Sequence, residues 1–232
     1  KGVVITEDFL ERNEKFLEEE LQLYTVYPDI YLDTIKPIDS QFDLFPYQRL
    51  FLRSLMRYNQ IYITATRAAS KSFLSVLGLY LQCVFIPNHK CSIVAPVKTQ
   101  GVKIMRQKVE EIIKIWPLLE KELEVFMGKP HMNFSKDVAE LYFKNGSKFT
   151  CEGATDSSRG LRLHATFLDE VRDADGDIIS EVILPQLNVS RRDANGLVNP
   201  YEVCNQQVIA GTSAGMKSSY AYSLLIETMI QA

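Results

Sequence analysis

Ala65-Thr66-Arg67-Ala68-Ala69-Ser70-Lys71-Ser72 is the stretch that decides the fold. A short apolar run precedes it in the sequence, and a longer apolar run follows it. Residues 61–64 are mainly β-branched and aromatic, which predicts a strand, and residues 70–84 have the length of a buried helix. The stretch matches the phosphate-loop consensus G-x-x-x-x-G-K-[ST] at its Lys-Ser pair, although Ala65 and Ser70 replace both glycines. A loop between a strand and a helix start gathers backbone N–H donors, so we expect an anion site here.

A second motif, Thr166-Phe167-Leu168-Asp169-Glu170, ends another apolar run much further along the chain. This run also predicts a strand, and α/β sheets place their ligand chemistry at the carboxyl ends of parallel strands. The interval between the two motifs has room for a further strand, a helix and a hairpin. That is more than a compact P-loop GTPase uses, and it favours a motor-type ATPase with an extra strand between its motifs.

The two motifs together predict a site that binds ATP with Mg²⁺ and hydrolyses the nucleotide. Lys71 would reach the β- and γ-phosphates, and Ser72 would supply a hydroxyl group to Mg²⁺. Asp169 would hold the same ion through water, and Glu170 would orient or deprotonate the attacking water. The loop residues before Lys71 would surround the phosphates: Thr66, Arg67, Ala68, Ala69 and Ser70.

Hydrophobic periodicity predicts how the rest of the chain is built. An acidic amphipathic helix is predicted over residues 7–24. Asp177 stands near the expected N-cap of the last helix. The remaining helices are predicted over residues 47–58, 98–115 and 177–189. The remaining strands are predicted over residues 91–95, 163–168 and 208–211.

Two further segments complete the predicted architecture. Residues 139–152 have the pattern of a hairpin with Asn145-Gly146 as a two-residue turn. Residues 25–46 contain three prolines and little periodicity, which predicts an extended connector. Strands that alternate with long helices predict an α/β fold with a mainly parallel sheet, covered on both faces, and the hairpin as an antiparallel addition at one edge.

Composition narrows the class of protein. The 232 residues are 46% hydrophobic and 24% charged, which is ordinary for a folded chain. The longest apolar stretch, residues 73–86, is too short to span a bilayer, so no membrane partner is expected. The net charge of −3 means that any DNA contact must use a local basic patch.

The cysteines, the histidines and the two ends of the sequence give further indications. The four cysteines form no C-x-x-C pair and are expected to be core thiols in a cytoplasmic protein. The three histidines stand far apart in the sequence, which argues against a zinc site. The first residue is not Met, and the end resembles an unfinished helix, so we expect an excised domain of a longer protein.

Four segments, taken in order, resemble the N-terminal ATPase domain of the large terminase subunit of tailed bacteriophages, the motor that packages DNA into procapsids. Leu44-Phe45-Pro46-Tyr47-Gln48 resembles the family's adenine-proximal segment, and Arg67 stands where the family has its loop arginine. Ser158-Arg159-Gly160-Leu161-Arg162 resembles the family's Arg-Gly segment. Gly211-Thr212-Ser213-Ala214-Gly215 resembles the coupling motif. The likeness covers most of residues 42–220, and the phosphate loop without glycine departs from the family pattern.

The resemblance implies a P-loop NTPase fold of the ASCE, RecA-like type. The ATPase domain would occupy residues 41–232, with residues 1–40 as an N-terminal helix and connector packed on it. Gln48 would hydrogen-bond the base, Thr212 and Ser213 would sense the γ-phosphate, and Arg67 would act on the γ-phosphate in cis. The candidates to reach a neighbouring subunit's site are Arg106, Arg159 and Arg162.

The resemblance also implies partners. These are double-stranded DNA, a portal protein and a small terminase subunit. The chain would form a homo-oligomeric ring on the portal. It would act in the cytoplasm of the infected host cell. The isolated chain could be a monomer. Arg191-Arg192, or the basic side chains Lys98, Lys103, Arg106 and Lys108, could contact DNA phosphates. The family's C-terminal nuclease domain is not expected within these residues.

Two other functions fit the same motifs. A helicase-like nucleic-acid translocase shares the glutamine segment and the Asp-Glu pair, but it requires a second ATPase lobe in the full protein. A non-hydrolysing nucleotide-binding module would tolerate the degenerate loop, but it would have no need of Glu170. Steady release of phosphate, compared with that of a Glu170→Ala variant, distinguishes the binding module from an ATPase.

Overall fold

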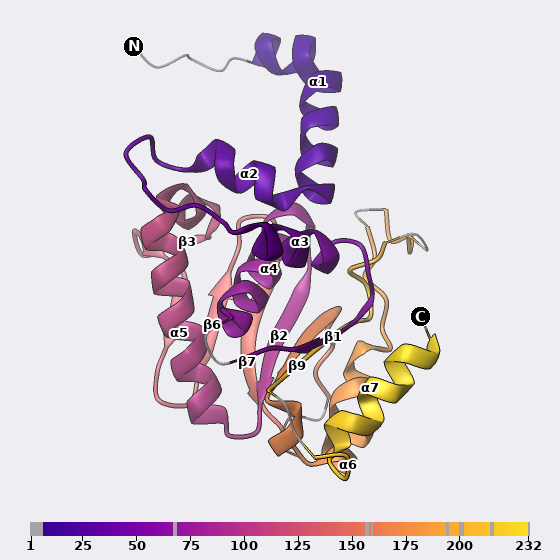
Figure 1. Ribbon diagram of the computed structural model, residues 1–232. Helices are drawn as coiled ribbons and strands as arrows, with labels where there is room; N and C mark the ends of the chain where they lie inside the picture. The colour runs from indigo at the N-terminus through magenta and orange to yellow at the C-terminus, as the bar shows by residue number, and fades with distance from the viewer. Residues whose placement is uncertain are drawn as a thin grey trace.

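A seven-stranded sheet lies at the centre of the computed structural model, which describes residues 7–66, 69–155, 158, 160–193, 195–199, 202–213 and 216–231 (Figure 1). The strands of this sheet are β1 (Gln60–Thr64), β2 (Lys90–Ala95), β5 (Met132–Phe134), β6 (Ala139–Tyr142), β7 (Lys148–Gly153), β8 (Ala165–Asp169) and β9 (Gln207–Thr212). The longer helices are α1 (Glu7–Val26), α2 (Pro28–Ile35), α3 (Pro46–Leu55), α4 (Lys71–Phe85), α5 (Lys98–Ile115) and α7 (Tyr220–Gln231).

The strand order is β1-β9-β8-β2-β7-β6-β5. The strands from β1 to β7 pair in parallel, whereas β6 and β5 add to β7 in antiparallel fashion. The predicted α/β fold, with a mainly parallel sheet and an antiparallel addition at one edge, is therefore confirmed. A separate ribbon of β3 (Val125–Phe126) and β4 (Lys129–Pro130) lies beside it and was not predicted.

The hairpin between β6 and β7 is confirmed, but its turn is one residue longer than predicted. The backbone N–H of Phe143 donates to the carbonyl of Ser147 (3.0 Å), and that of Gly146 donates to the carbonyl of Phe143 (3.0 Å). Gly146 has a φ of +81°. These bonds define a three-residue loop that ends in a left-handed glycine, a common alternative to the two-residue turn.

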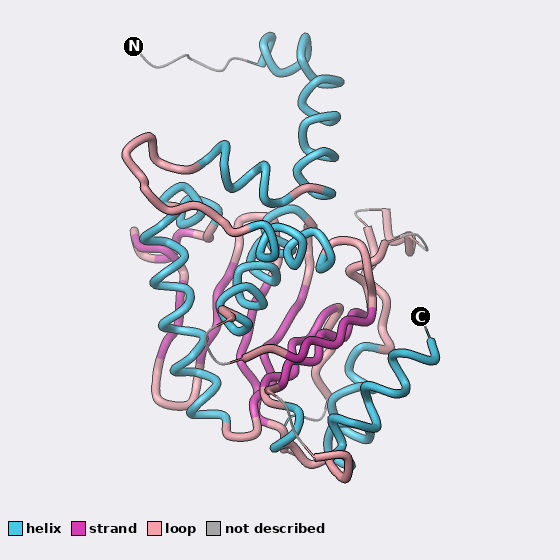
Figure 2. Tube along the Cα trace, in the orientation of Figure 1, coloured by secondary structure: helices cyan, strands magenta, loops and turns pink. Residues whose placement is uncertain are grey.

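Helices cover both faces of the sheet (Figure 2). Ile93 and Phe167 point into the larger core, which also contains buried residues of α3, α4 and α5. Their neighbours Val94 and Leu168 point the opposite way, into a second core shared with α7 and with the helical segment after β8. Because β2 and β8 are buried on both faces, they appear in the sequence as nearly continuous apolar runs, each with one buried polar residue, Ser92 or Thr166.

The connector predicted over residues 25–46 is partly wrong, because α2 occupies its first half. Pro28 is the first residue of this helix, where a missing N–H group costs nothing. The carboxylate of Asp29 is fully buried and accepts two hydrogen bonds from Arg53 (2.8 and 2.7 Å). This contact ties α2 to α3. In Figure 1, α1 extends away from the body of the molecule, beyond α2.

The helix predicted over residues 177–189 is also less regular than expected. It consists of α6 (Gly176–Ile178), a π-helical turn η4 (Ile179–Ile183) and a 3₁₀ turn η5 (Leu184–Leu187). Asp175, rather than Asp177, caps its start, because the Asp175 side chain accepts a hydrogen bond from the N–H of Asp177 (2.9 Å). None of the helices within the described ranges is long and apolar enough to cross a membrane.

Two histidines that lie far apart in the sequence meet below the sheet's amino edge. The rings of His89 and His164 are 5.5 Å apart, and His89 is fully buried. The Nε2 of His89 lies 3.3 Å from the Oε1 of Gln82. Burial lowers the pKa of His89 to about 3 and that of His164 to about 4, and nearby positive charge adds to both shifts.

These shifts predict that acid destabilises the fold. An unfolded histidine takes up a proton near pH 6.5. In the folded chain, His164 stays neutral down to about pH 4 and His89 down to about pH 3. The unfolded state therefore binds more protons, and the free energy of unfolding should fall as pH drops from about 6.5 to 4, by up to about 1.4 kcal/mol per pH unit for each histidine. Urea titrations at several pH values should show a shallower fall for His89→Asn than for the original chain. His131→Asn is the control, and an equal slope in all three proteins would contradict the prediction.

Candidate functional site

The segment predicted to be a phosphate loop begins where β1 ends, and its last residues lead into the first turn of α4. The N–H of Ala65 donates to the carbonyl of Thr212 (3.2 Å), which fixes the start of the loop against β9. Ser70 adopts a left-handed conformation, with φ 55° and ψ 22°. This is a backbone shape that glycine adopts freely and that costs other residues roughly 1–2 kcal/mol. Ser70 therefore takes the conformation that its glycine counterpart would favour, and Lys71 starts the helix.

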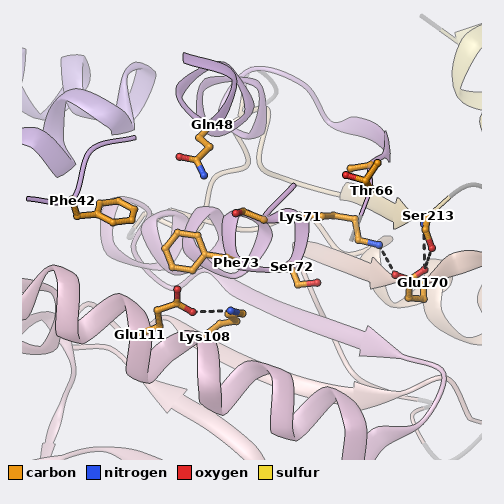
Figure 3. A pocket seen from close by; sticks show the side chains of 12 residues that line it. Phe42, Gln48, Thr66, Lys71, Ser72, Phe73, Lys108, Glu111, Glu170 and Ser213 are labelled. Atoms are coloured by element: carbon orange, nitrogen blue, oxygen red, sulfur yellow. Dashed lines mark hydrogen bonds and ion pairs between the residues drawn. The ribbon is translucent and has the colours of Figure 1, made fainter. Parts of the chain in front are cut away.

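Lys71, Ser72, Asp169 and Glu170 meet at the carboxyl edge of the sheet (Figure 3 shows three of them). The Nζ of Lys71 donates to the Oε1 of Glu170 (2.8 Å) and lies 3.8 Å from the Oδ1 of Asp169. The hydroxyl of Ser72 lies 3.5 Å from the same Asp169 oxygen. The structure thus brings the two motifs together, although nearly half the chain separates them.

Glu170 is held from several directions. Its Oε2 accepts hydrogen bonds from the N–H (3.3 Å) and hydroxyl (3.1 Å) of Ser213. The Nε of Arg172 lies 3.7 Å from the same oxygen. Its backbone is left-handed, with φ 47° and ψ 54°, a costly conformation that is found in particular at functional sites. Glu170 is thus a fixed carboxylate rather than a solvated turn residue.

The two neighbouring carboxylates have pKa values that move in opposite directions. Burial raises the pKa of Asp169, and the adjacent Glu170 adds to this shift against the opposing charge of Lys71. Burial alone would also raise the pKa of Glu170, but its hydrogen bonds to Lys71 and Ser213 lower that pKa below its usual value. Glu170 is therefore ionised at neutral pH.

Gly211 makes room for the lysine. A Cβ atom at this position would lie 2.6 Å from the ring of Phe167 and 3.1 Å from the Cδ of Lys71. Both neighbours are buried, so neither could move without disturbing the core or the site. In the predicted coupling motif, Gly211 therefore gives space, while Ser213 binds Glu170. Thr212 is buried, and its hydroxyl donates to the carbonyl of Ser213 (2.9 Å).

A cavity of about 350 Å³ opens beside these groups. One end of it is lined by Thr66, Ser70, Lys71 and Ser72 of the predicted phosphate loop and by two other candidate residues, Glu170 and Ser213. Gln48, also predicted, enters from α3 (Figure 3). Its Oε1 accepts from the N–H of Phe45 (2.9 Å), while its Nε2 has no hydrogen-bond partner among the described residues.

The sequence did not identify the opposite part of the cavity wall. Phe42, Phe73, Lys108 and Glu111 line it, and they come from three separate segments of the chain. The sequence predicts Lys108 only as a possible contact for DNA phosphates. Phe73 follows the Lys-Ser pair directly and could have been suspected, but no local pattern brings Phe42 or α5 to this place.

The arginines divide into three groups. Two candidates, Arg67 and Arg159, lie outside the described residues. The same is true of Ala68 in the loop and of Ala214 and Gly215 in the coupling segment. Arg106 pairs with Glu110 on the exposed side of α5 (2.9 Å), and Arg162 is exposed just before β8. Arg172, which the sequence did not single out, is the arginine placed beside Glu170.

The donor set fits a magnesium ion. Mg²⁺ prefers hard oxygen ligands and usually keeps several waters, with one or two carboxylates from the protein. The hydroxyl of Ser72 and the carboxylate of Asp169 face each other beside the cavity and supply such oxygens. No group of three histidine, cysteine, aspartate or glutamate side chains suited to a metal occurs in the described part of the chain.

Comparison with known proteins places this arrangement among known folds. No protein-family model and no curated protein matches the chain. The large terminase of bacteriophage HK97 is 15% identical with a TM-score of 0.62, over 89% of this chain and 41% of that one. A variant of the Thermus phage P74-26 large terminase ATPase domain is 18% identical with a TM-score of 0.50, over 81% and 74%. The large terminase of a thermophilic bacteriophage is 10% identical with a TM-score of 0.51, over 82% and 43%.

The chain thus spans about two fifths of the length of the HK97 protein. At such low identities the likeness concerns the fold, and it agrees with the resemblance noted in the motifs. The chain has the α/β fold that is seen in the ATPase domain of bacteriophage large terminases.

Proposed function

We propose that this chain is the ATPase domain of a DNA-packaging motor of the large terminase kind. The observation that carries the proposal is the convergence of Lys71 and Ser72, at the start of α4, with Asp169 and Glu170, at the end of β8. A lysine, a hydroxyl group and two carboxylates around one cavity match the chemistry of phosphoryl transfer, which depends on positioning and on compensation of charge.

Each side chain has a role that follows from its position. The ammonium of Lys71 binds the β- and γ-phosphates, helped by the backbone donors of the loop. Ser72 and Asp169 hold Mg²⁺, which neutralises charge on the phosphate oxygens when bound. Glu170 orients the attacking water and receives its proton. Ser213, bonded to Glu170, together with Thr212 transmits a change at this carboxylate to β9 and the segment that follows it.

The wider function rests on the structural neighbours, which are described as large terminases. We infer that the track is double-stranded DNA, that the chain works in a ring of identical subunits on a portal protein with a small terminase subunit, and that this occurs in the host cytoplasm. Residues 41–232 form the ATPase domain in this proposal, with residues 1–40 as its N-terminal extension. Arg67 acts within the subunit, and an arginine such as Arg159 or Arg162 reaches a neighbour.

The rival functions are less well supported. A helicase-like translocase would share the motifs, but the three solved structures compared with this chain above are all large terminases. A non-hydrolysing binding module would have no reason to fix Glu170 with two hydrogen bonds from Ser213 in a strained backbone conformation.

The first test of the proposal is calorimetric titration with a non-hydrolysable ATP analogue and Mg²⁺. The original chain should bind the analogue, and Lys71→Ala should weaken binding by roughly 10- to 100-fold, because a charge-assisted hydrogen bond to phosphate contributes about 1.5–3 kcal/mol. Lys129→Ala, which changes an exposed lysine of β4, is the matched control and should bind like the original chain. Absence of binding to the folded original chain at millimolar nucleotide would contradict the proposal.

A further inference from the structure

Glu111 lines the cavity but belongs to none of the four sequence motifs. It comes from α5, and together with Lys108, Phe73 and Phe42 it lines the wall away from Glu170. Figure 3 shows Glu111 and Gln48 reaching toward the cavity from opposite sides, with Phe73 between them. On the proposed function, the phosphates occupy the end at Lys71 and Ser72, so this region receives the rest of the nucleotide.

The carboxylate of Glu111 is oriented but not saturated. Its Oε2 accepts a hydrogen bond from the Nζ of Lys108 (2.7 Å), one turn earlier on the same helix. Its Oε1 has no partner among the described residues. Lys108 in turn lies over the ring of Phe73, 5.8 Å from its centroid. The lysine thus positions Glu111 and leaves one carboxylate oxygen available to a ligand.

A carboxylate that only accepts hydrogen bonds selects a ligand that donates them. A ribose offers two neighbouring hydroxyl groups, whereas the adenine ring offers a single amino group. The sugar lies between the phosphates and the base, and Phe73, beside Glu111, is the next residue after the Lys-Ser pair. The free amide nitrogen of Gln48, on the opposite wall, suits a ring nitrogen of the base.

We propose that Glu111, positioned by Lys108, binds the ribose hydroxyls of the nucleotide and makes the site selective for ribonucleotides over deoxyribonucleotides. Acidic side chains bind the ribose 2′-hydroxyl in dinucleotide-binding folds by the same chemistry. The proposal rests on the proposed function, since it needs nucleotide phosphates at Lys71. It adds a determinant of sugar specificity that lies outside all four motifs of the sequence.

The test measures a ratio of affinities. ADP and 2′-deoxy-ADP, each with Mg²⁺, are titrated calorimetrically into the original chain and into Glu111→Ala. The original chain should bind ADP roughly 10-fold more tightly than 2′-deoxy-ADP, because a hydrogen bond to a charged acceptor is lost with the 2′-hydroxyl. In Glu111→Ala the ratio should fall close to one. A ratio is used because the variant also frees Lys108, which can change the affinity for both nucleotides alike.

Glu110→Ala is the matched control. Glu110 is the adjacent residue on α5, its carboxylate pairs with Arg106, and it does not line the cavity. This variant should keep the ratio of the original chain. Equal affinity of the original chain for both nucleotides would overturn the ribose proposal and leave the ATPase proposal intact. An altered preference between ADP and GDP in Glu111→Ala, with an unchanged ratio for the sugar, would assign Glu111 to the base instead. Failure of every nucleotide to bind would overturn both proposals.

Discussion

Replacement of Glu170 by glutamine is expected to lower the rate of ATP hydrolysis by roughly 10²–10⁴-fold, the usual contribution of a positioned acid–base group. Glutamine has nearly the same shape and can still accept a hydrogen bond from Ser213. It cannot accept a proton from the attacking water. The rate is to be measured as steady release of phosphate at saturating Mg·ATP.

Binding should respond differently from turnover in the same variant. Lys71 donates to Glu170 in the structure, and the neutral amide holds the ammonium less strongly than the carboxylate does. Nucleotide affinity should therefore be kept or increased. Glu181→Gln, which changes an exposed glutamate on η4, is the control and should leave both quantities unchanged. Turnover by Glu170→Gln at the original rate would assign the catalytic carboxylate to another residue.

Replacement of Trp116 by alanine is expected to lower the free energy of unfolding by about 3–5 kcal/mol, the range for truncation of a large buried aromatic side chain. Trp116 is almost fully buried at the end of α5. Its ring meets that of Phe42 edge-on at 5.3 Å, and its Nε1 donates to the carbonyl of Leu32 in α2 (3.0 Å). One side chain thus joins α5, α2 and the segment that carries Phe42 to the cavity.

The measurement is urea unfolding followed by far-ultraviolet circular dichroism, since Trp116 is the chain's single tryptophan and its fluorescence is lost in the variant. Trp116→Phe separates the ring from the hydrogen bond and should cost less, because most of the buried aromatic surface remains. Tyr58→Ala removes a mostly exposed ring and is the control. A cost below about 1 kcal/mol for Trp116→Ala would mean that the site collapses around the missing ring.

Sequence patterns predicted the elements whose periodicity is strong. The buried strands β2, β8 and β9 and the long helices α4 and α5 were found close to their true bounds, because each is apolar along its length or along one face. The prediction failed where a tertiary contact outweighs local pattern. The helix α2 is only eight residues long and is stabilised by buried Asp29 against α3, a contact that the sequence does not reveal. The π-helical turn of η4 likewise has no local signature.

The candidate site residues that belong to short sequence motifs could be predicted. Lys71 and Ser72 were recognised from the loop, and Asp169 and Glu170 from the end of a strand, so their convergence followed from the rule for parallel sheets. The left-handed conformation of Ser70 was not predicted, because serine stands there instead of glycine. Glu111 and Arg172 were missed, since only the folded chain brings α5 and the turn after β8 beside the motifs.

On the proposed function, the ion pair between Lys71 and Glu170 couples nucleotide binding to a change at the carboxylate. The lysine that would grip a triphosphate and the carboxylate that would act on water are bonded to each other. A triphosphate that draws the ammonium away would therefore free one oxygen of the carboxylate, while Ser213 continues to hold the other. Binding of ATP and loss of the lysine contact of Glu170 would then occur in one step. In the proposed ring of subunits, this coupling would prevent a subunit from activating its carboxylate before it has bound ATP.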